Sequence, residues 1–117
     1  MTDSARGFPI AVLVSGGGTN LQALIDASAA SDHAATIVVV ISDRPGVRAL
    51  ERAAAAGIPT EVVSWEGSSD REAFTGDLCD AAERHGAHAM VLAGFMRILA
   101  PNAMKRFPDA IINTHPA

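Results

Sequence analysis

Residues 9–20 read Pro-Ile-Ala-Val-Leu-Val-Ser-Gly-Gly-Gly-Thr-Asn, and this stretch decides the fold class. Its first half is an unbroken aliphatic run from Pro9 to Val14, which is typical of a strand covered on both faces. Three glycines at positions 16–18 interrupt the run. Apolar side chains at Leu21, Leu24 and Ile25 then recur at helical spacing. The stretch therefore predicts a buried strand, a tight glycine turn and the start of a helix.

The alternation of strand and helix signals continues along the chain. Further strands are expected at residues 36–41, 60–63, 88–93 and 110–114, and helices at residues 47–56, 101–107 and from a cap at 69 or 70 to 84. This pattern predicts one α/β domain over residues 1–117, with a Rossmann-like parallel sheet of about five strands alternating with helices. Residues 1–8 are expected to form a flexible tail. Because ligands of such sheets bind beyond the carboxyl ends of the strands, functional residues are expected at 15–20, 42–44, 64–65, 94–97 and 113–116.

The composition excludes several classes of protein. The 117 residues are 49% hydrophobic and 19% charged, as in a folded domain rather than a disordered chain. The net charge of -4 argues against a nucleic-acid partner, and no apolar run approaches the ~18 residues that a bilayer span needs. The N-terminus lacks the pattern of a secretory signal, and the single cysteine, Cys79, cannot form an internal disulfide. We therefore expect a cytoplasmic protein that acts on small molecules, with no membrane or nucleic-acid partner.

Several polar residues are expected to have structural roles only. No metal site is expected, because the spacing of Cys79, His85 and His88 fits no zinc pattern. Arg44, Arg48 and Arg52 recur every four residues and predict a solvent-facing side of a helix. Trp65 is expected either to form a pocket wall or to pack in the interior.

The glycine turn is a candidate anion site. Glycines allow the backbone to approach an anion closely, and the free N–H groups of the first helical turn point toward it. The dinucleotide pattern G-x-G-x-x-G is not met, because Leu21 stands at the third glycine position, and no Gly-Lys-Ser/Thr follows as in nucleoside-triphosphate loops. Two interpretations remain open: a phosphate site, or a tight turn in which Thr19 or Asn20 caps the helix.

Asn113 and His115 form a second candidate site. They lie two residues apart at the end of a strand, so their side chains are expected on the same side. A carboxamide donor beside an imidazole suits acyl transfer, because the two can stabilise an oxyanion and move a proton. The alternative is a histidine that caps a strand end next to a turn proline.

Four segments occur together with these features. They are residues 14–22 (Val-Ser-Gly-Gly-Gly-Thr-Asn-Leu-Gln), 70–72 (Asp-Arg-Glu), 91–99 (Val-Leu-Ala-Gly-Phe-Met-Arg-Ile-Leu) and 112–116 (Ile-Asn-Thr-His-Pro). In order and spacing, from about Ile10 to the last residue, they resemble the bacterial phosphoribosylglycinamide formyltransferases. The combination is specific, although each glycine or histidine alone is not.

The resemblance implies a reaction and a set of site residues. A formyl group would pass from the co-substrate 10-formyltetrahydrofolate to the amino group of phosphoribosylglycinamide. The residues that the resemblance assigns are Gly18, Thr19 and Asn20 for the ribonucleotide phosphate; Arg71, Met96, Arg97, Ile98 and Leu99 for the folate; Asn113 as an oxyanion donor; and His115 as the proton carrier. It implies no metal and is compatible with a homodimer.

The sequence departs from the family pattern mainly in length. Gly17 and Ala117 stand where relatives often carry asparagine and serine. The family is close to twice as long, and its second half supplies a catalytic aspartate, a folate-binding loop and further ribonucleotide contacts. We therefore expect these residues to be the N-terminal portion of a longer gene product, or a truncated chain of low activity with an uncovered sheet edge. The alternatives are another folate-dependent formyltransferase, a formyltetrahydrofolate hydrolase, or a phosphate-binding half-domain without turnover.

Overall fold

The structure is a computed structural model that describes residues 7–30, 35–65 and 70–114. Its elements follow in the order β1 (Phe8–Val14), α1 (Thr19–Ala30), β2 (Ala35–Ser42), α2 (Arg48–Ala55), β3 (Thr60–Val62), α3 (Arg71–Arg84), β4 (Ala89–Ala93), α4 (Asn102–Arg106) and β5 (Ile111–Thr114). Every strand and helix that the sequence predicts is present, with bounds that differ by a few residues. Within the described ranges, no helix combines the length and the apolar character that a bilayer crossing requires.

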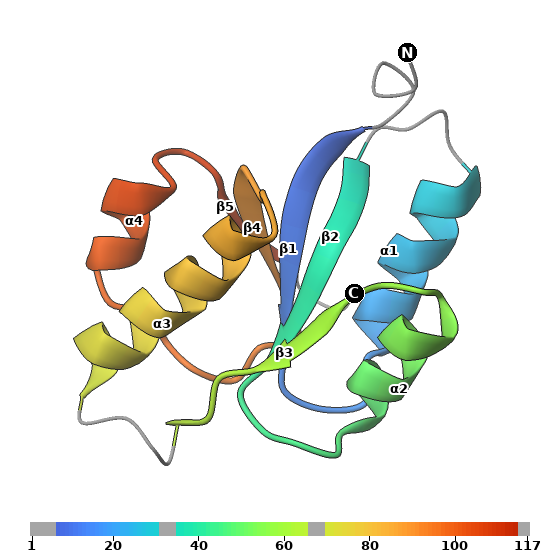
Figure 1. The fold of residues 1–117 in the computed structure, drawn as a ribbon, viewed down its shortest axis with the longest axis horizontal. Coiled ribbons are helices and arrows are strands. Elements are labelled where there is room, and N and C mark those ends of the chain that lie inside the picture. The colour runs from blue at the N-terminus through green and yellow to red at the C-terminus, as the bar shows by residue number, and fades with distance from the viewer. Residues whose placement is uncertain (1–6, 31–34, 66–69, 115–117) are drawn as a thin grey trace.

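The strands form one parallel sheet in the order β3-β2-β1-β4-β5, which confirms the predicted α/β fold (Figure 1). Two consecutive crossovers carry the chain from β1 to β2 and then to β3 at one edge. The chain then returns past β1 to form β4 and β5 on the other side. At the centre of the sheet, Leu13 of β1 pairs in register with Ile41 of β2 and Leu92 of β4.

Helices cover both faces of the sheet, with α1 and α2 on one side and α3 and α4 on the other (Figure 1). Successive residues of β1 alternate between the two layers. Val12 and Val14 pack with Leu21 of α1, whereas Leu13 packs with Phe74 of α3. This explains the unbroken aliphatic run, because a strand between two helical layers has no polar face.

The helix α3 begins where the sequence predicts a cap. The Asp70 carboxylate accepts a hydrogen bond from the Ala73 backbone N–H at 2.7 Å, so it satisfies one of the free donors of the first turn. Ser69, the other candidate cap, lies outside the described residues. The cap fixes the start of the helix that carries Phe74 into the core.

The predicted N-terminal tail is shorter than expected. Phe8 already belongs to β1, and its ring meets the His88 ring edge-on with centroids 5.7 Å apart. The Gly7 N–H donates to the Thr36 hydroxyl at 2.9 Å. The prediction is therefore wrong for Phe8, because this residue pairs with Ala35 of β2, while residues 1–6 lie outside the described part.

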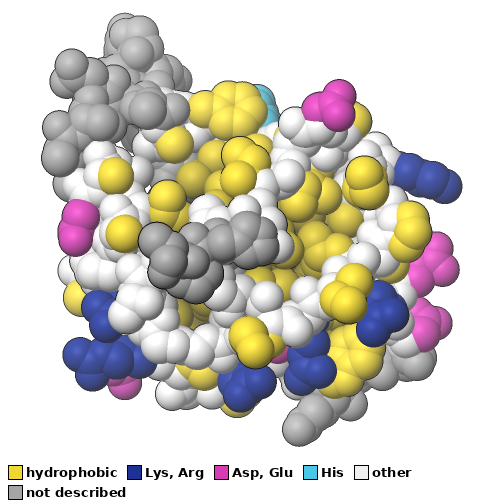
Figure 2. All heavy atoms as spheres, turned by 180° about the vertical axis from the view of Figure 1, so that it is seen from behind, with side chains coloured by type: hydrophobic (Ala, Val, Ile, Leu, Met, Phe, Trp, Pro, Cys, Tyr) yellow, Lys and Arg dark blue, Asp and Glu magenta, His cyan; other side chains and the backbone are white. Residues whose placement is uncertain are grey.

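The β5 side of the molecule keeps apolar side chains at its surface. Hydrophobic groups gather into a broad, partly hollowed patch on the face opposite to the view of Figure 1 (Figure 2). Near β5, the large exposed hydrophobic residues are Ile98, Met104 and Ile112. Within the described residues, β5 pairs with β4 and with no other strand.

Candidate functional site

The central strands β1 and β4 are neighbours, but the chain leaves them in opposite directions. Because one connection leads to β2 and the other to β5, the loops after β1 and β4 separate at the carboxyl edge of the sheet. A cavity of about 440 Å³ lies there, lined by Ser15, Gly16, Gly17, Gly18, Thr19, Asn20, Arg44, Ala93, Gly94 and Met96. Among these lining residues Arg44 alone is charged. The glycine turn of the sequence thus forms one wall of a cavity at the switch point of the fold.

Gly18 is required by the packing of the glycine loop. Its φ is +84°, in the left-handed region that favours glycine. A Cβ at this position would lie 2.8 Å from both Cα and Cβ of Ala49 in α2. The loop therefore sits directly on the neighbouring helix, and a side chain at Gly18 would force the two apart.

The polar side chains of the loop differ in whether they make hydrogen bonds to the rest of the described chain. The Ser15 hydroxyl is buried and accepts a hydrogen bond from the Met96 N–H at 2.8 Å, so it ties the loop after β1 to the loop after β4. The side chains of Thr19 and Asn20 line the cavity and make no hydrogen bond within the described part of the chain. The capping role considered for them is therefore not observed, and both remain available to a ligand.

Arg52 contacts this loop from behind. The sequence predicts a solvent-facing arginine, but its Nε donates to the Gly17 carbonyl at 2.8 Å, and its guanidinium also donates to the Gln22 side-chain carbonyl at 3.2 Å. The prediction is wrong because Gly18 brings α2 so close that the Arg52 side chain lies against the loop.

A buried carboxylate anchors the segment that follows β4. The Arg97 Nε donates to Asp43 Oδ2 at 2.9 Å, and the Arg97 guanidinium lies 5.1 Å from the centre of the Trp65 ring. The Asp43 side chain is fully buried, and its Oδ1 has no hydrogen-bond partner in the described residues. The Nε of the neighbouring Arg44 lies 4.0 Å from Oδ1. The segment is thus fixed against the ends of β2 and β3, although 54 positions separate Asp43 from Arg97 in the sequence.

A second hollow lies on the other side of this segment. It has a volume of about 460 Å³ and is lined by Leu92, Arg97, Ile98, Leu99, Ala100, Pro101, Ala103, Met104, Ile111 and Asn113. We call it the apolar groove. Of the five residues that the resemblance assigns to the folate, Arg97, Ile98 and Leu99 line the groove, Met96 lines the glycine cavity, and Arg71 lines neither. Residues 96–99 therefore separate the two hollows.

Asn113 lines the apolar groove. It pairs in register with Leu92, and the next residue, Thr114, donates from its hydroxyl to the Leu92 carbonyl at 3.0 Å. His115 lies outside the described residues, so its pairing with Asn113 stays a prediction. Arg71 is exposed at the start of α3 and lines neither hollow, so the structure does not bring it together with the other candidate residues.

Known proteins match this chain over nearly its whole length. The family model described as Formyl transferase matches residues 8–117. The chain belongs to the formyl transferase family. It is 38% identical over 108 residues to the phosphoribosylglycinamide formyltransferase of Escherichia coli, covering 92% of this chain and 51% of that protein. It is 42% identical over 117 residues to the trifunctional purine biosynthetic protein adenosine-3 of Drosophila melanogaster, covering 97% of this chain and 9% of that protein.

Solved structures of this family share the fold. The glycinamide ribonucleotide transformylase 1 of Symbiobacterium toebii superposes with a TM-score of 0.89 at 36% identity, covering 94% of this chain and 52% of that one. The chain thus spans about half the length of its single-function relatives and a far smaller share of the trifunctional ones. The similarity identified from sequence motifs is confirmed as that of the N-terminal portion of the formyl transferase fold.

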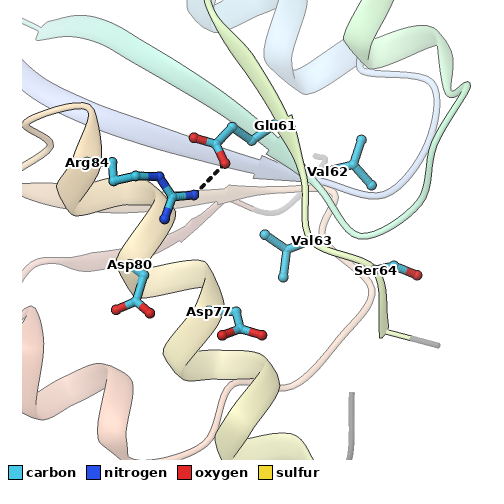
Figure 3. Close-up of a pocket in the computed structure, with 7 residues that line it drawn as sticks. All are labelled: Glu61, Val62, Val63, Ser64, Asp77, Asp80 and Arg84. Carbon is cyan, nitrogen blue, oxygen red and sulfur yellow. Dashed lines mark hydrogen bonds and ion pairs between the residues drawn. The ribbon is translucent and has the colours of Figure 1, made fainter. Parts of the chain in front are cut away.

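A third hollow, between β3 and α3, has the wrong charge for a phosphate (Figure 3). Its lining includes Asp77 and Asp80, and its one arginine, Arg84, is already paired with Glu61 at 2.6 Å. Partial burial acts to raise the pKa of Glu61, but hydrogen bonds from Arg84 and His85 outweigh it and leave the pKa below its usual value. We assign this hollow a structural role.

The cysteine and the histidines of the described chain do not form a metal site. Cys79 is buried in α3, and burial raises the pKa of its thiol. His85 contacts Glu61 at 2.7 Å, and His88 packs against the Phe8 ring. No group of three metal-binding side chains occurs among the residues that the structure describes.

Proposed function

We propose that this chain is the ribonucleotide-binding portion of a cytoplasmic glycinamide ribonucleotide formyltransferase. It would take part in de novo purine biosynthesis by transferring a formyl group from 10-formyltetrahydrofolate to the amino group of 5'-phosphoribosylglycinamide. The observation that carries the proposal is the pair of hollows at the switch point: a glycine-lined cavity and an apolar groove, separated by residues 96–99. Membership in the formyl transferase family, with relatives named for this reaction, supports the same assignment.

The glycine cavity suits the ribonucleotide phosphate. Gly18, Thr19 and Asn20 would hold it through backbone N–H groups and through two side chains that have no hydrogen-bond partner among the described residues. Arg44, the one charged residue of the lining, adds a positive charge at the cavity wall. A dianionic ligand is therefore favoured here over a neutral one.

The apolar groove suits the folate co-substrate. Ile98, Leu99 and Met104 offer apolar surface to a flat heterocycle, and Ile98 is 71% exposed. Arg71 is assigned to the folate only by the family motif.

Asn113 and His115 are proposed to carry the chemistry. The substrate amine attacks the formyl carbon, forming a new C–N bond, and the Asn113 amide donates a hydrogen bond to the resulting oxyanion. The bond from the formyl carbon to the folate nitrogen then breaks. His115 relays a proton, so that the amine loses one and the departing nitrogen gains one. The position of Asn113 on the groove supports its role.

Calorimetric titration tests the phosphate site. We expect the chain to bind 5'-phosphoribosylglycinamide about 10- to 150-fold more tightly than the dephosphorylated riboside, since a charge-assisted hydrogen bond contributes about 1.5–3 kcal/mol. Equal affinities would contradict phosphate recognition. Binding of the formyl donor without binding of the ribonucleotide would favour a formyltetrahydrofolate hydrolase or another folate-dependent formyltransferase.

Turnover distinguishes the enzyme from a phosphate-binding half-domain. We expect formyl transfer to fall by about 10²- to 10⁴-fold in His115→Ala, because general acid–base catalysis contributes that much. Binding of the ribonucleotide should persist in this variant. An unchanged rate in the complete gene product would contradict the catalytic role, and binding without turnover in that product would support the half-domain.

A further inference from the structure

Two consecutive carbonyl groups of the glycine loop point toward α2. The Gly16 carbonyl accepts a hydrogen bond from the Ala49 N–H at 3.0 Å, and the Gly17 carbonyl accepts one from the Arg52 Nε at 2.8 Å. One donor is the backbone of α2, and the other is a side chain one turn further along the same helix. Both contacts lie on the side of the loop that packs against Ala49.

The direction of each carbonyl sets the direction of the N–H that follows it. A trans peptide is planar, with its C=O and N–H groups pointing in opposite directions, and no cis peptide occurs among the described residues. The N–H groups of Gly17 and Gly18 therefore point away from α2. Neither N–H has an acceptor in the part of the chain that the structure describes, and both residues line the glycine cavity.

The Gly16–Gly17 peptide is held more firmly than the Gly17–Gly18 peptide. The Gly16 carbonyl is held by a backbone donor that remains after any substitution other than proline. The Gly17–Gly18 peptide lies between two flexible residues and depends on one side chain. Arg52 also donates a hydrogen bond to the Gln22 side chain of α1, at 3.2 Å. Its guanidinium therefore bridges the glycine loop and the first turn of α1.

We propose that Arg52 is a positioning residue for anion binding. By holding the Gly17 carbonyl toward α2, it keeps the Gly18 N–H turned into the cavity, where that N–H donates to a phosphate oxygen. The inference rests on the proposed phosphate site and adds to it a residue that does not touch the ligand. Without Arg52 the peptide is free to rotate and to present its carbonyl, which repels an anion.

A titration of the 117-residue chain with inorganic phosphate, followed by amide NMR, tests the proposal. In the unaltered chain the Gly18 amide resonance should move as phosphate binds. In Arg52→Gln we expect affinity to fall about tenfold, as for the loss of one charge-assisted hydrogen bond, and the Gly18 resonance to stop responding. Arg48→Gln is the matched control: it removes an equal charge from an exposed position of the same helix and should leave both readouts unchanged.

Two further variants separate position from charge. Arg52→Lys keeps the charge but not the planar fork that reaches Gly17 and Gln22 together, so the loss of affinity should persist. Gln22→Ala leaves Arg52 in place but removes one of its two anchors, and we expect a smaller loss. If Arg52→Gln does not fold, these two variants still test whether Arg52 positions the glycine loop.

The outcomes distinguish two failures. If phosphate does not move the glycine resonances of the unaltered chain, the proposed phosphate site is wrong. If phosphate binds there but Arg52→Gln behaves like Arg48→Gln, or Arg52→Lys binds like the unaltered chain, the positioning role of Arg52 is wrong.

Discussion

The glycine cavity and the apolar groove lie on either side of residues 96–99, yet they are built from different parts of the chain. The cavity presents backbone groups of a loop that is packed on α2 and tied to the loop after β4. The groove presents side chains, several of which are largely exposed, including Met104 at 68% and Ile98 at 71%. One hollow is therefore shaped by contacts behind it, and the other by the side chains on its surface.

This difference determines which substitutions each hollow tolerates. A surface made of backbone groups is damaged by changes that move the backbone, so its sensitive positions lie partly outside the cavity. A surface made of exposed side chains is altered by exchanging those side chains, with little effect on folding.

Arg97→Met should cause the largest loss of stability. It leaves the fully buried Asp43 carboxylate without its hydrogen-bonded partner, and breaking such a pair costs about 3 kcal/mol. Both hollows should suffer, because residues 96–99 lose their anchor. Urea denaturation measures the change. In an Asp43→Asn background the same substitution should cost much less, and an equal cost in both backgrounds would contradict the buried-charge explanation.

Gly18→Ala should damage the glycine cavity. The new Cβ would meet Ala49 at 2.8 Å in a left-handed backbone conformation, so we expect a loss of about 2 kcal/mol in the free energy of unfolding. Phosphate affinity should fall as well. Gly17→Ala is the control for stability, because a Cβ there meets nothing within 4 Å and its φ is not positive. Equal effects in the two variants would show that the contact with α2 does not shape the loop.

Ile98→Ser should weaken the groove without weakening the fold. The side chain is exposed, so stability should hardly change. Binding of 10-formyltetrahydrofolate should lose about 1 kcal/mol, or about fivefold in affinity, since apolar surface on the groove is removed. Val62→Ser, at an exposed position in the β3–α3 hollow, should bind normally. Unchanged folate affinity in Ile98→Ser would place the co-substrate elsewhere.

Glu61→Gln should have the smallest effect, and neither hollow should respond to it. The lowered pKa of Glu61 means that its carboxylate stabilises the fold above about pH 4.5, and this contribution is lost as the pH falls through the lowered pKa. Because the ion pair is partly solvated, we expect a loss of at most about 1 kcal/mol at neutral pH. Thermal unfolding across this pH range measures it. Asp77→Asn, in the same hollow, should keep the acid dependence that Glu61→Gln reduces.

Much of the fold could be read from local patterns. The aliphatic run through Val14 and the glycines after it predict a buried strand that turns into a helix, and β1 and α1 follow that prediction. Asp70 was also identifiable as a cap, because its role depends on a neighbour three residues away. The N-terminal tail was misjudged at Phe8, where pairing with β2 and contact with His88 outweigh the weak local signal.

The site was predictable only in part. The glycine loop and residues 96–99 are contiguous motifs, so the sequence identifies them directly. The roles of Arg52 and Asp43 depend on contacts 35 and 54 positions away. Helical spacing made Arg52 look solvent-exposed, since periodicity describes one helix and not the loop packed against it.

By itself, then, the amino-acid order determined the alternation of strands and helices, the parallel sheet and the family motifs, because these arise from neighbouring residues and from the burial of strands on both faces. Only the tertiary structure decided that α2 turns the loop carbonyls away from the cavity and that one buried carboxylate anchors the wall between the two hollows. The physical reason is that hydrogen-bond direction and close packing depend on atoms that the fold brings together from distant parts of the chain.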